Sequence, residues 1–112
     1  MANTLNKERI IMKIEINVAK DFSDLPYGRT DVESTTNATK FKEEILIPAI
    51  NKNPEKLIID FNGVLGLGGS FVDEAFYDLY KSTRKTKEEL NNLIEIKSDS
   101  KHILEKVKNS LN

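Results

Sequence analysis

The fold is indicated most clearly by residues 57–76, which read LIIDFNGVLGLGGSFVDEAF. The segment opens with a nearly continuous apolar run over residues 57–61, and such a run is typical of a central strand covered on both faces. Four glycines follow within residues 62–69, which predicts a loop. From Ser70 to about Thr83, apolar residues recur at helical spacing, so a helix should follow the loop. We therefore expect a strand-loop-helix unit.

The elements upstream of this unit are less regular. Apolar and polar residues alternate over 12–18, which predicts a strand with one buried face. Residues 19–37 lack such a pattern and contain Pro26 and Gly28, so they predict a long loop or a weak hairpin. A loop of this length suggests either a function or a short strand that the pattern does not reveal. Residues 39–50 predict a helix that Pro48 should kink or shorten.

The elements downstream complete an alternating order of strands and helices. A charged connection leads to a short predicted strand over 93–96 and to a last helix, for which Asp99 or Ser100 can provide the N-cap. This order predicts an α/β fold with a small mixed sheet of about four strands and helices packed against it. The first strand should lie at an edge and could pair in either direction. We expect a single domain over residues 1–112, with its core at about 10–111.

Composition narrows the function classes. The 17 basic and 18 acidic residues give a net charge of −1, whereas nucleic-acid-binding domains usually carry a basic excess, so nucleic-acid binding is a minor option. The chain has no cysteine and no metal-ligand spacing of His and carboxylates, so we expect no metal and no cofactor. Residues 1–9 lack the apolar core of a signal peptide, and no apolar run approaches membrane-spanning length. These features predict a cytoplasmic protein without membrane contact.

Ser70 lies where the glycine-rich loop meets the helix, and it has two interpretations that involve the backbone. The loop and the helix N-terminus could hold a phosphate, but the loop lacks the Lys of G-x-x-x-x-G-K-S/T and the register of G-x-G-x-x-G. Asp73 and Glu74 would also repel an anion there. Alternatively, Ser70 could be the N-cap of the helix, with Asp73 at the third helical position as in a capping box.

Two further interpretations concern the hydroxyl of Ser70 itself. A nucleophilic serine needs a base and an oxyanion hole, yet the one histidine, His102, lies on the last predicted helix, and the sequence lacks the G-x-S-x-G elbow. A regulatory serine is the other possibility. Phosphorylation would place negative charge at the positive end of the helix dipole, where Asp73 and Glu74 compete for the same interaction. The added charge could then repel a binding partner.

Two other positions are candidates for a site. Tyr27-Gly28-Arg29 predicts a turn with Gly28 at positive φ and Arg29 paired with a surface carboxylate. In the functional interpretation, Arg29 instead lies near the Ser70 turn and binds a carboxylate or phosphate of a partner in bidentate fashion. Asp60, at the end of the predicted central strand, could accept hydrogen bonds from the following turn or belong to the site.

Residues 60–76, together with Tyr27–Arg29 and residues 41–49, resemble the bacterial family of STAS-like domains of unknown function. The resemblance covers residues 10–98, approximately, and the family is related more distantly to the STAS domains of anti-sigma factor antagonists. In those antagonists, a strand ending in Asp leads to a Ser at the start of a helix, and a GHKL-type kinase both phosphorylates that Ser and binds the domain. Ser70 falls at this position, although Gly68-Gly69-Ser70-Phe71 replaces the antagonists' Asp-Ser-Ser-Gly-like run.

The resemblance implies a non-enzymatic, regulatory protein-interaction module with Ser70 as a candidate phospho-switch. Its partner would be a protein, with a GHKL-type ATPase or an anti-sigma-like kinase as the implied class. The alternative is a small ligand- or nucleotide-binding subunit that uses the glycine-rich loop 63–70. The candidate binding or regulatory residues are Tyr27, Arg29, Asp60, Gly68, Gly69, Ser70, Asp73 and Glu74.

Overall fold

The structure is a computed structural model that describes residues 12–111. The predicted polar start of the chain, residues 1–9, and residues 10 and 11 of the predicted core lie outside the described residues. No helix in the described part of the chain is long and apolar enough to span a bilayer. The elements are β1 (Lys13–Asn17), α2 (Val18–Asp21), α3 (Ala38–Phe41), the π-helical η1 (Lys42–Leu46), α4 (Ile47–Asn51), β2 (Lys56–Asp60), α5 (Gly69–Phe76), α6 (Leu79–Thr83), α7 (Lys87–Leu93), β3 (Ile94–Lys97) and α8 (Lys101–Leu111).

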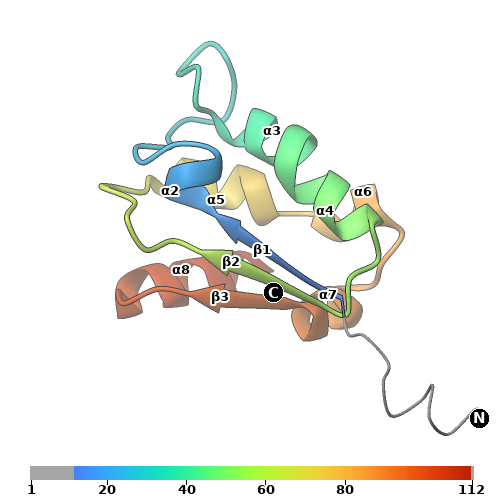
Figure 1. Cartoon of the computed structure of the whole chain (residues 1–112). Coiled ribbons are helices and arrows are strands. Elements are labelled where there is room, and N and C mark those ends of the chain that lie inside the picture. The colour runs from blue at the N-terminus through green and yellow to red at the C-terminus, as the bar shows by residue number, and fades with distance from the viewer. Residues whose placement is uncertain (1–11, 112) are drawn as a thin grey trace, which may run out of the picture.

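The three strands form a parallel sheet in the order β1-β2-β3 (Figure 1). The predicted α/β class is confirmed, and so is the edge position of the first strand. The count of about four strands was too high for the described residues, and the sheet is parallel rather than mixed. Helical connections between successive strands explain the parallel pairing, because a crossover returns the chain to the same end of the sheet.

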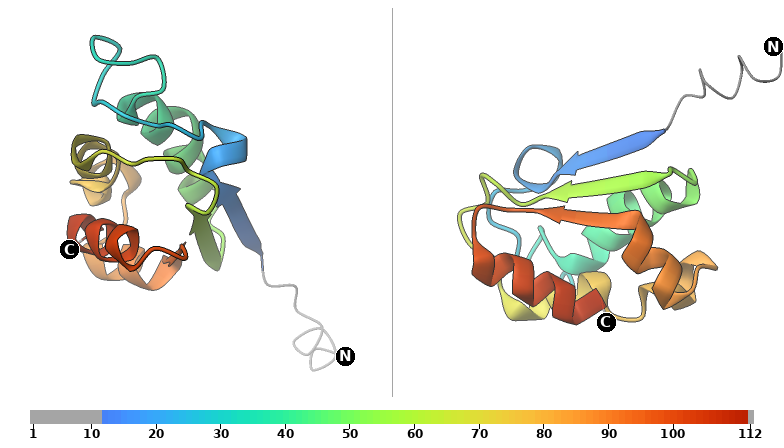
Figure 2. Two further views of the ribbon diagram at one scale, coloured as in Figure 1. Left: turned by 90° about the vertical axis from the view of Figure 1, so that its left-hand side faces the viewer. Right: turned by 90° about the horizontal axis from the view of Figure 1, so that it is seen from below.

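The larger helices lie on one side of the sheet (Figure 2). Side chains alternate between the faces of a strand, and the inward-facing Ile16, Leu57, Ile59 and Ile94 are buried against these helices. The expectation that the central strand is covered on both faces was wrong for the described residues. Ile58 points to the other face, where it lies half-buried between Glu15 and Glu95 of the neighbouring strands.

The helix predicted over 39–50 is present as the consecutive segments α3, η1 and α4. Pro48 is the second residue of α4 and lies two positions after Leu46, the last residue of the π-helical segment. A proline lacks the N–H of the helical ladder, and its ring clashes with the carbonyl four residues earlier. The wider turn of a π segment relieves that clash. The expected kink or shortening therefore takes the form of a local π segment in a helix that continues to Asn51.

The helix predicted from Ser70 to about Thr83 is split into α5 and α6. Tyr77 is extended, with ψ of 137°, and Asp78 adopts the left-handed conformation, with φ of 53°. The apolar positions on both sides of the break are nevertheless buried, including Phe76 and Leu79. The spacing thus predicted burial correctly, but it did not reveal the change in backbone direction.

Two short helices were not predicted, and side-chain caps stabilise both. At α2, Asn17 Oδ1 accepts the N–H of Lys20 at 3.0 Å, and the N–H of Asn17 donates to the Asp21 carboxylate at 2.8 Å. At α7, Thr86 and Glu89 form a capping box with bonds of 3.0 and 2.9 Å. The backbone N–H of Thr86, with a smaller contribution from its hydroxyl, lowers the pKa of the exposed Glu89 carboxyl.

Aromatic rings hold the helical layer together. Phe71 of α5 lies 5.7 Å from Phe41 of α3 and 6.1 Å from Phe22, measured between ring centroids. Phe61, just after β2, contacts Phe76 at the end of α5 with a centroid distance of 6.4 Å. These contacts fix α5, and therefore the turn that precedes it, against both the sheet and α3.

Candidate functional site

The turn from β2 places Ser70 at the second residue of α5 rather than at its N-cap. Gly68 is the N-cap residue, and no side chain caps this helix. The structure therefore differs from the expected cap and capping box, because Gly69 already has helical conformation and begins the helix one residue earlier. Ser70 is half-buried, and its hydroxyl does not serve the helix end.

Asp60 lies at the base of this turn and is only 7% exposed. Its carboxylate accepts the N–H of Asn62 at 2.8 Å. The side-chain oxygen of Asn62 in turn accepts the N–H of Asp99 at 2.8 Å, which connects the turn to the start of α8. Asp60 thus shapes the first residues of the turn from within, as an Asx turn does.

Asp73 and Glu74, one turn below Ser70, point to opposite neighbours. The hydroxyl of Ser110 on α8 donates to Asp73 Oδ1 at 3.1 Å. Glu74 forms an ion pair with Lys42 of η1, with 3.5 Å between Nζ and Oε2. Each carboxylate therefore ties α5 to a flanking helix, and both remain close to the first turn of α5, where they would oppose a second negative charge.

The glycines of the loop differ in what the fold requires of them. Gly63 has φ of +95° and would bring an added Cβ to 3.2 Å from the Cβ of Ala19. By contrast, an added Cβ on Gly68 would meet nothing within 4 Å, and one on Gly69 would meet only Lys106 Nζ at 3.9 Å. Packing within the described residues does not require glycine at 68 or 69. At the start of α5, Gly69 is exposed and Gly68 is half-buried, with its carbonyl accepting the N–H of Val72 at 3.2 Å.

Two exposed leucines lie at the turn that precedes α5. Leu65 is 77% exposed and Leu25 is 53% exposed. The N–H of Leu65 donates to the carbonyl of Asp24 at 2.6 Å, and Leu25 Cδ1 lies 3.6 Å from the Cβ position of Gly66. We call Leu25, Leu65 and residues 66–70 the turn surface. Leu25, Leu65 and Gly69 are exposed, and the other residues are half-buried.

The Tyr27–Arg29 segment is ordered by the start of α3. Gly28 has φ of +83°, as the predicted turn requires. The carbonyl of Arg29 accepts hydrogen bonds from the N–H and the hydroxyl of Thr39, at 3.1 and 2.7 Å. Glu33 accepts the backbone N–H of Arg29 at 2.9 Å, and no carboxylate within residues 12–111 is paired with the Arg29 guanidinium. No described contact joins Arg29 to Ser70. Tyr27 is half exposed.

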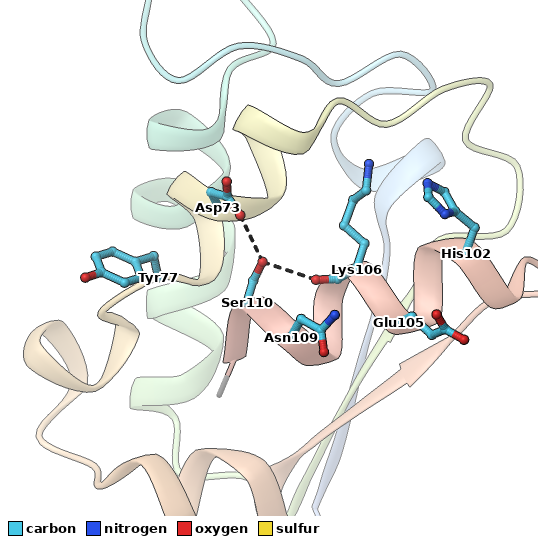
Figure 3. Close-up of a pocket in the computed structure, with 7 residues that line it drawn as sticks. All are labelled: Asp73, Tyr77, His102, Glu105, Lys106, Asn109 and Ser110. Carbon is cyan, nitrogen blue, oxygen red and sulfur yellow. Dashed lines mark hydrogen bonds between the residues drawn. The ribbon is translucent and has the colours of Figure 1, made fainter.

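A hollow of about 720 Å³ lies between α5 and α8 (Figure 3). Figure 3 shows side chains from both helices around it, with Asp73 and Ser110 directed toward one another. The glycine-rich loop 63–70 does not line this hollow, so its shape offers no support for a ligand site built on the loop. The lining residues are Asp73, Tyr77, His102, Glu105, Lys106, Asn109 and Ser110.

Comparison with protein families identifies the domain. Residues 37–104, more than half of the chain, match the family described as STAS-like domain of unknown function (DUF4325). The chain belongs to this family. The family expected from the sequence is thus confirmed for this STAS-like domain. The matched segment contains β2, most of the turn surface and α5, and it begins after Tyr27–Arg29. Comparisons with curated proteins and with solved structures gave no match.

Proposed function

We propose that this STAS-like domain is a non-enzymatic regulatory module that binds a protein partner through the turn surface. The observation that supports this proposal is that Leu25, Leu65 and Gly69 are all exposed in the turn surface, where an added Cβ at Gly68 or Gly69 would meet no close packing. The surface lies beyond the C-terminal end of the central strand, where open parallel sheets place their binding sites. Exposed apolar side chains beside accessible backbone suit a protein surface better than a small anion.

The partner class that we propose is a GHKL-type ATPase or an anti-sigma-like kinase, with Ser70 as the phosphorylated residue. The resemblance of residues 60–76 to anti-sigma factor antagonists is one support. The structure adds that the Ser70 hydroxyl does not cap α5. A phosphate at Ser70 would add about two negative charges to the turn surface, close to Asp73 and Glu74. Repulsion of an acidic partner, or of the kinase after transfer, would then release the complex.

Replacing Ser70 with alanine should change the free energy of unfolding by less than about 0.5 kcal/mol, because no cap is lost. Ser70→Glu should also fold, since a negative charge near a helix N-terminus is favourable and offsets repulsion from Asp73 and Glu74. Urea denaturation followed by circular dichroism measures both variants. A loss of about 1 kcal/mol or more in Ser70→Ala would instead assign Ser70 a structural role.

The proposed function is tested by affinity purification of the tagged chain from its native host, with intact-mass spectrometry of all eluted proteins. We expect a phosphorylated fraction that maps to Ser70 and a co-purified GHKL-type ATPase. Ser70→Ala should retain the ATPase, whereas Ser70→Glu should release it. An unmodified chain whose set of bound proteins is the same for both variants would contradict the switch.

A further inference from the structure

One edge of the sheet is free of strand pairing within residues 12–111. The carbonyl of Met12 accepts the N–H of Lys56 at 3.4 Å, so Met12 directs its backbone groups toward β2. Backbone direction alternates along a strand, and Ile14 therefore also faces β2, whereas Lys13 and Glu15 direct their N–H and C=O groups outward. In the right-hand view of Figure 2, no coloured segment runs beside β1 on the edge that faces away from β2.

The outward backbone groups of Lys13 and Glu15 have no hydrogen-bond partner among the described residues. Farther along, the N–H of Asn17 is bound by the Asp21 carboxylate at 2.8 Å, which ends the free edge. Two donors and two acceptors thus remain on a short, regular stretch of strand. Natural proteins usually place charged side chains on such an edge, where they disfavour non-specific strand pairing. Here the charged side chains are those of Lys13 and Glu15, which are exposed.

We propose that β1 pairs antiparallel with β1 of a second copy of this chain, with Ile14 on the two-fold axis. Lys13 then lies opposite Glu15 of the second copy, and each such pair exchanges two backbone hydrogen bonds. Both side chains lie on the uncovered face of the sheet, so each Lys13 ammonium meets a carboxylate across the axis. The half-buried Ile14 meets its own copy on the helical face. All four free backbone groups are satisfied in this dimer.

The charges select this register over its neighbours. A shift of the two-fold axis to Lys13 would place two ammonium groups opposite one another, and a shift to Glu15 would do the same with two carboxylates. Like charges in directly opposite positions destabilise antiparallel strands, whereas opposite charges stabilise them. Only the register centred on Ile14 pairs unlike charges and at the same time uses the outward backbone groups of Lys13 and Glu15.

The other edge of the sheet does not offer the same complementarity. The carbonyl of Lys97 accepts the N–H of Phe61 at 2.8 Å, so Lys97 and Glu95 face β2, and the outward backbone groups belong to Ile94 and Ile96. The equivalent antiparallel pairing of β3 would centre on Glu95 and place it opposite its own copy. Repulsion at this position disfavours that dimer.

Sedimentation velocity of the full chain over a wide concentration range tests the proposal. We expect a concentration-dependent dimer, because four hydrogen bonds and a narrow contact area fall short of a standard-sized permanent interface. Glu15→Lys should weaken dimerisation about tenfold or more, since two attractive cross-strand pairs become repulsive. The double variant Lys13→Glu with Glu15→Lys should restore the dimer. Glu95→Lys, on the same face at the other edge, is the matched control and should leave dimerisation unchanged.

Crosslinking provides the geometric test, because the native chain has no cysteine. In an antiparallel pair without direct hydrogen bonds, opposite Cα atoms lie about 4.5 Å apart, within disulfide range. Ile14→Cys should therefore form a disulfide-linked dimer on mild oxidation, while Glu95→Cys, which lies at the axis of the equivalent β3 pairing, should not. The proposal is overturned if the native chain stays monomeric at every concentration. A dimer that is indifferent to Glu15→Lys, or that crosslinks through Glu95→Cys alone, would also overturn it.

Discussion

Replacing Phe71 with alanine should lower the free energy of unfolding by about 3–5 kcal/mol, which is a large share of the stability of a small domain. The Phe71 ring is fully buried and packs against both Phe22 and Phe41, so its removal leaves a cavity where α5 packs on α3. The melting temperature should fall by roughly 10–20 °C. Thermal and urea unfolding followed by circular dichroism measure the effect.

Tyr77→Ala is the matched control, because Tyr77 is 65% exposed and is the C-cap residue directly after α5. We expect this variant to lose less than about 1 kcal/mol. If Phe71→Ala and Tyr77→Ala were equally mild, the aromatic cluster would not hold α5 in place. The packing argument for a rigid turn surface would then be contradicted.

Replacing Gly28 with alanine should reduce the free energy of unfolding by about 2 kcal/mol or more. An L-residue is strained at the φ of +83° found there, and the new Cβ would lie 2.8 Å from the Cβ of Glu33. The carbonyl of Gly28 also accepts the N–H of Ala38 at 2.9 Å, so a shift of Gly28 disturbs the start of α3.

Gly69→Ala is the control with the opposite expected sign. Gly69 begins α5, its added Cβ has ordinary contact distance to Lys106, and alanine is the better helix former. We expect a gain in the free energy of unfolding of up to about 1 kcal/mol. Urea denaturation measures the free energy of unfolding of both variants. An equal loss in both would show that the glycines of the chain act alike, contrary to the geometry.

Much of the fold could be predicted because hydrophobic spacing reports burial. The run over 57–61 identified the central strand, and the stripe from Phe71 to Leu79 identified buried positions. Hydrophobic spacing did not predict which face of the sheet a residue occupies, nor where the backbone of a helix breaks. Ile58 belongs to the apolar run yet faces away from the helices, and the left-handed Asp78 divides a helix whose spacing continues across the break.

The short helices α2 and α7 depend on local caps rather than on an apolar face. The pair Thr86 and Glu89 has the spacing of a capping box, so attention to that spacing within the charged connection could have located α7. The proximity of the predicted loop 19–37 to the turn could not be predicted from any local sequence pattern. Leu25 and Leu65 are forty positions apart, and only tertiary structure brings them to the same surface.

The position of Ser70 at the loop-helix junction was predictable, but the role of its hydroxyl was not. Serine before a helix is a common N-cap, and the sequence gives no sign that Gly68 takes that place. Because Gly68 is the N-cap residue, the capping interpretation is wrong, and the Ser70 hydroxyl has no role in capping α5. Exposure of Leu65 could not be inferred either, because a leucine beside glycines is equally typical of a core position.

The most direct test of the turn surface compares the proteins captured by two folded variants from the native host. Leu65→Asp places a charge on the turn surface, whereas Val32→Asp places one on a residue that is 94% exposed in the loop before α3. Both variants should unfold like the native chain, which urea denaturation checks. We predict that quantitative mass spectrometry will show one partner lost with Leu65→Asp and retained with Val32→Asp. The same captured proteins for the native chain and both variants would contradict the proposed docking surface.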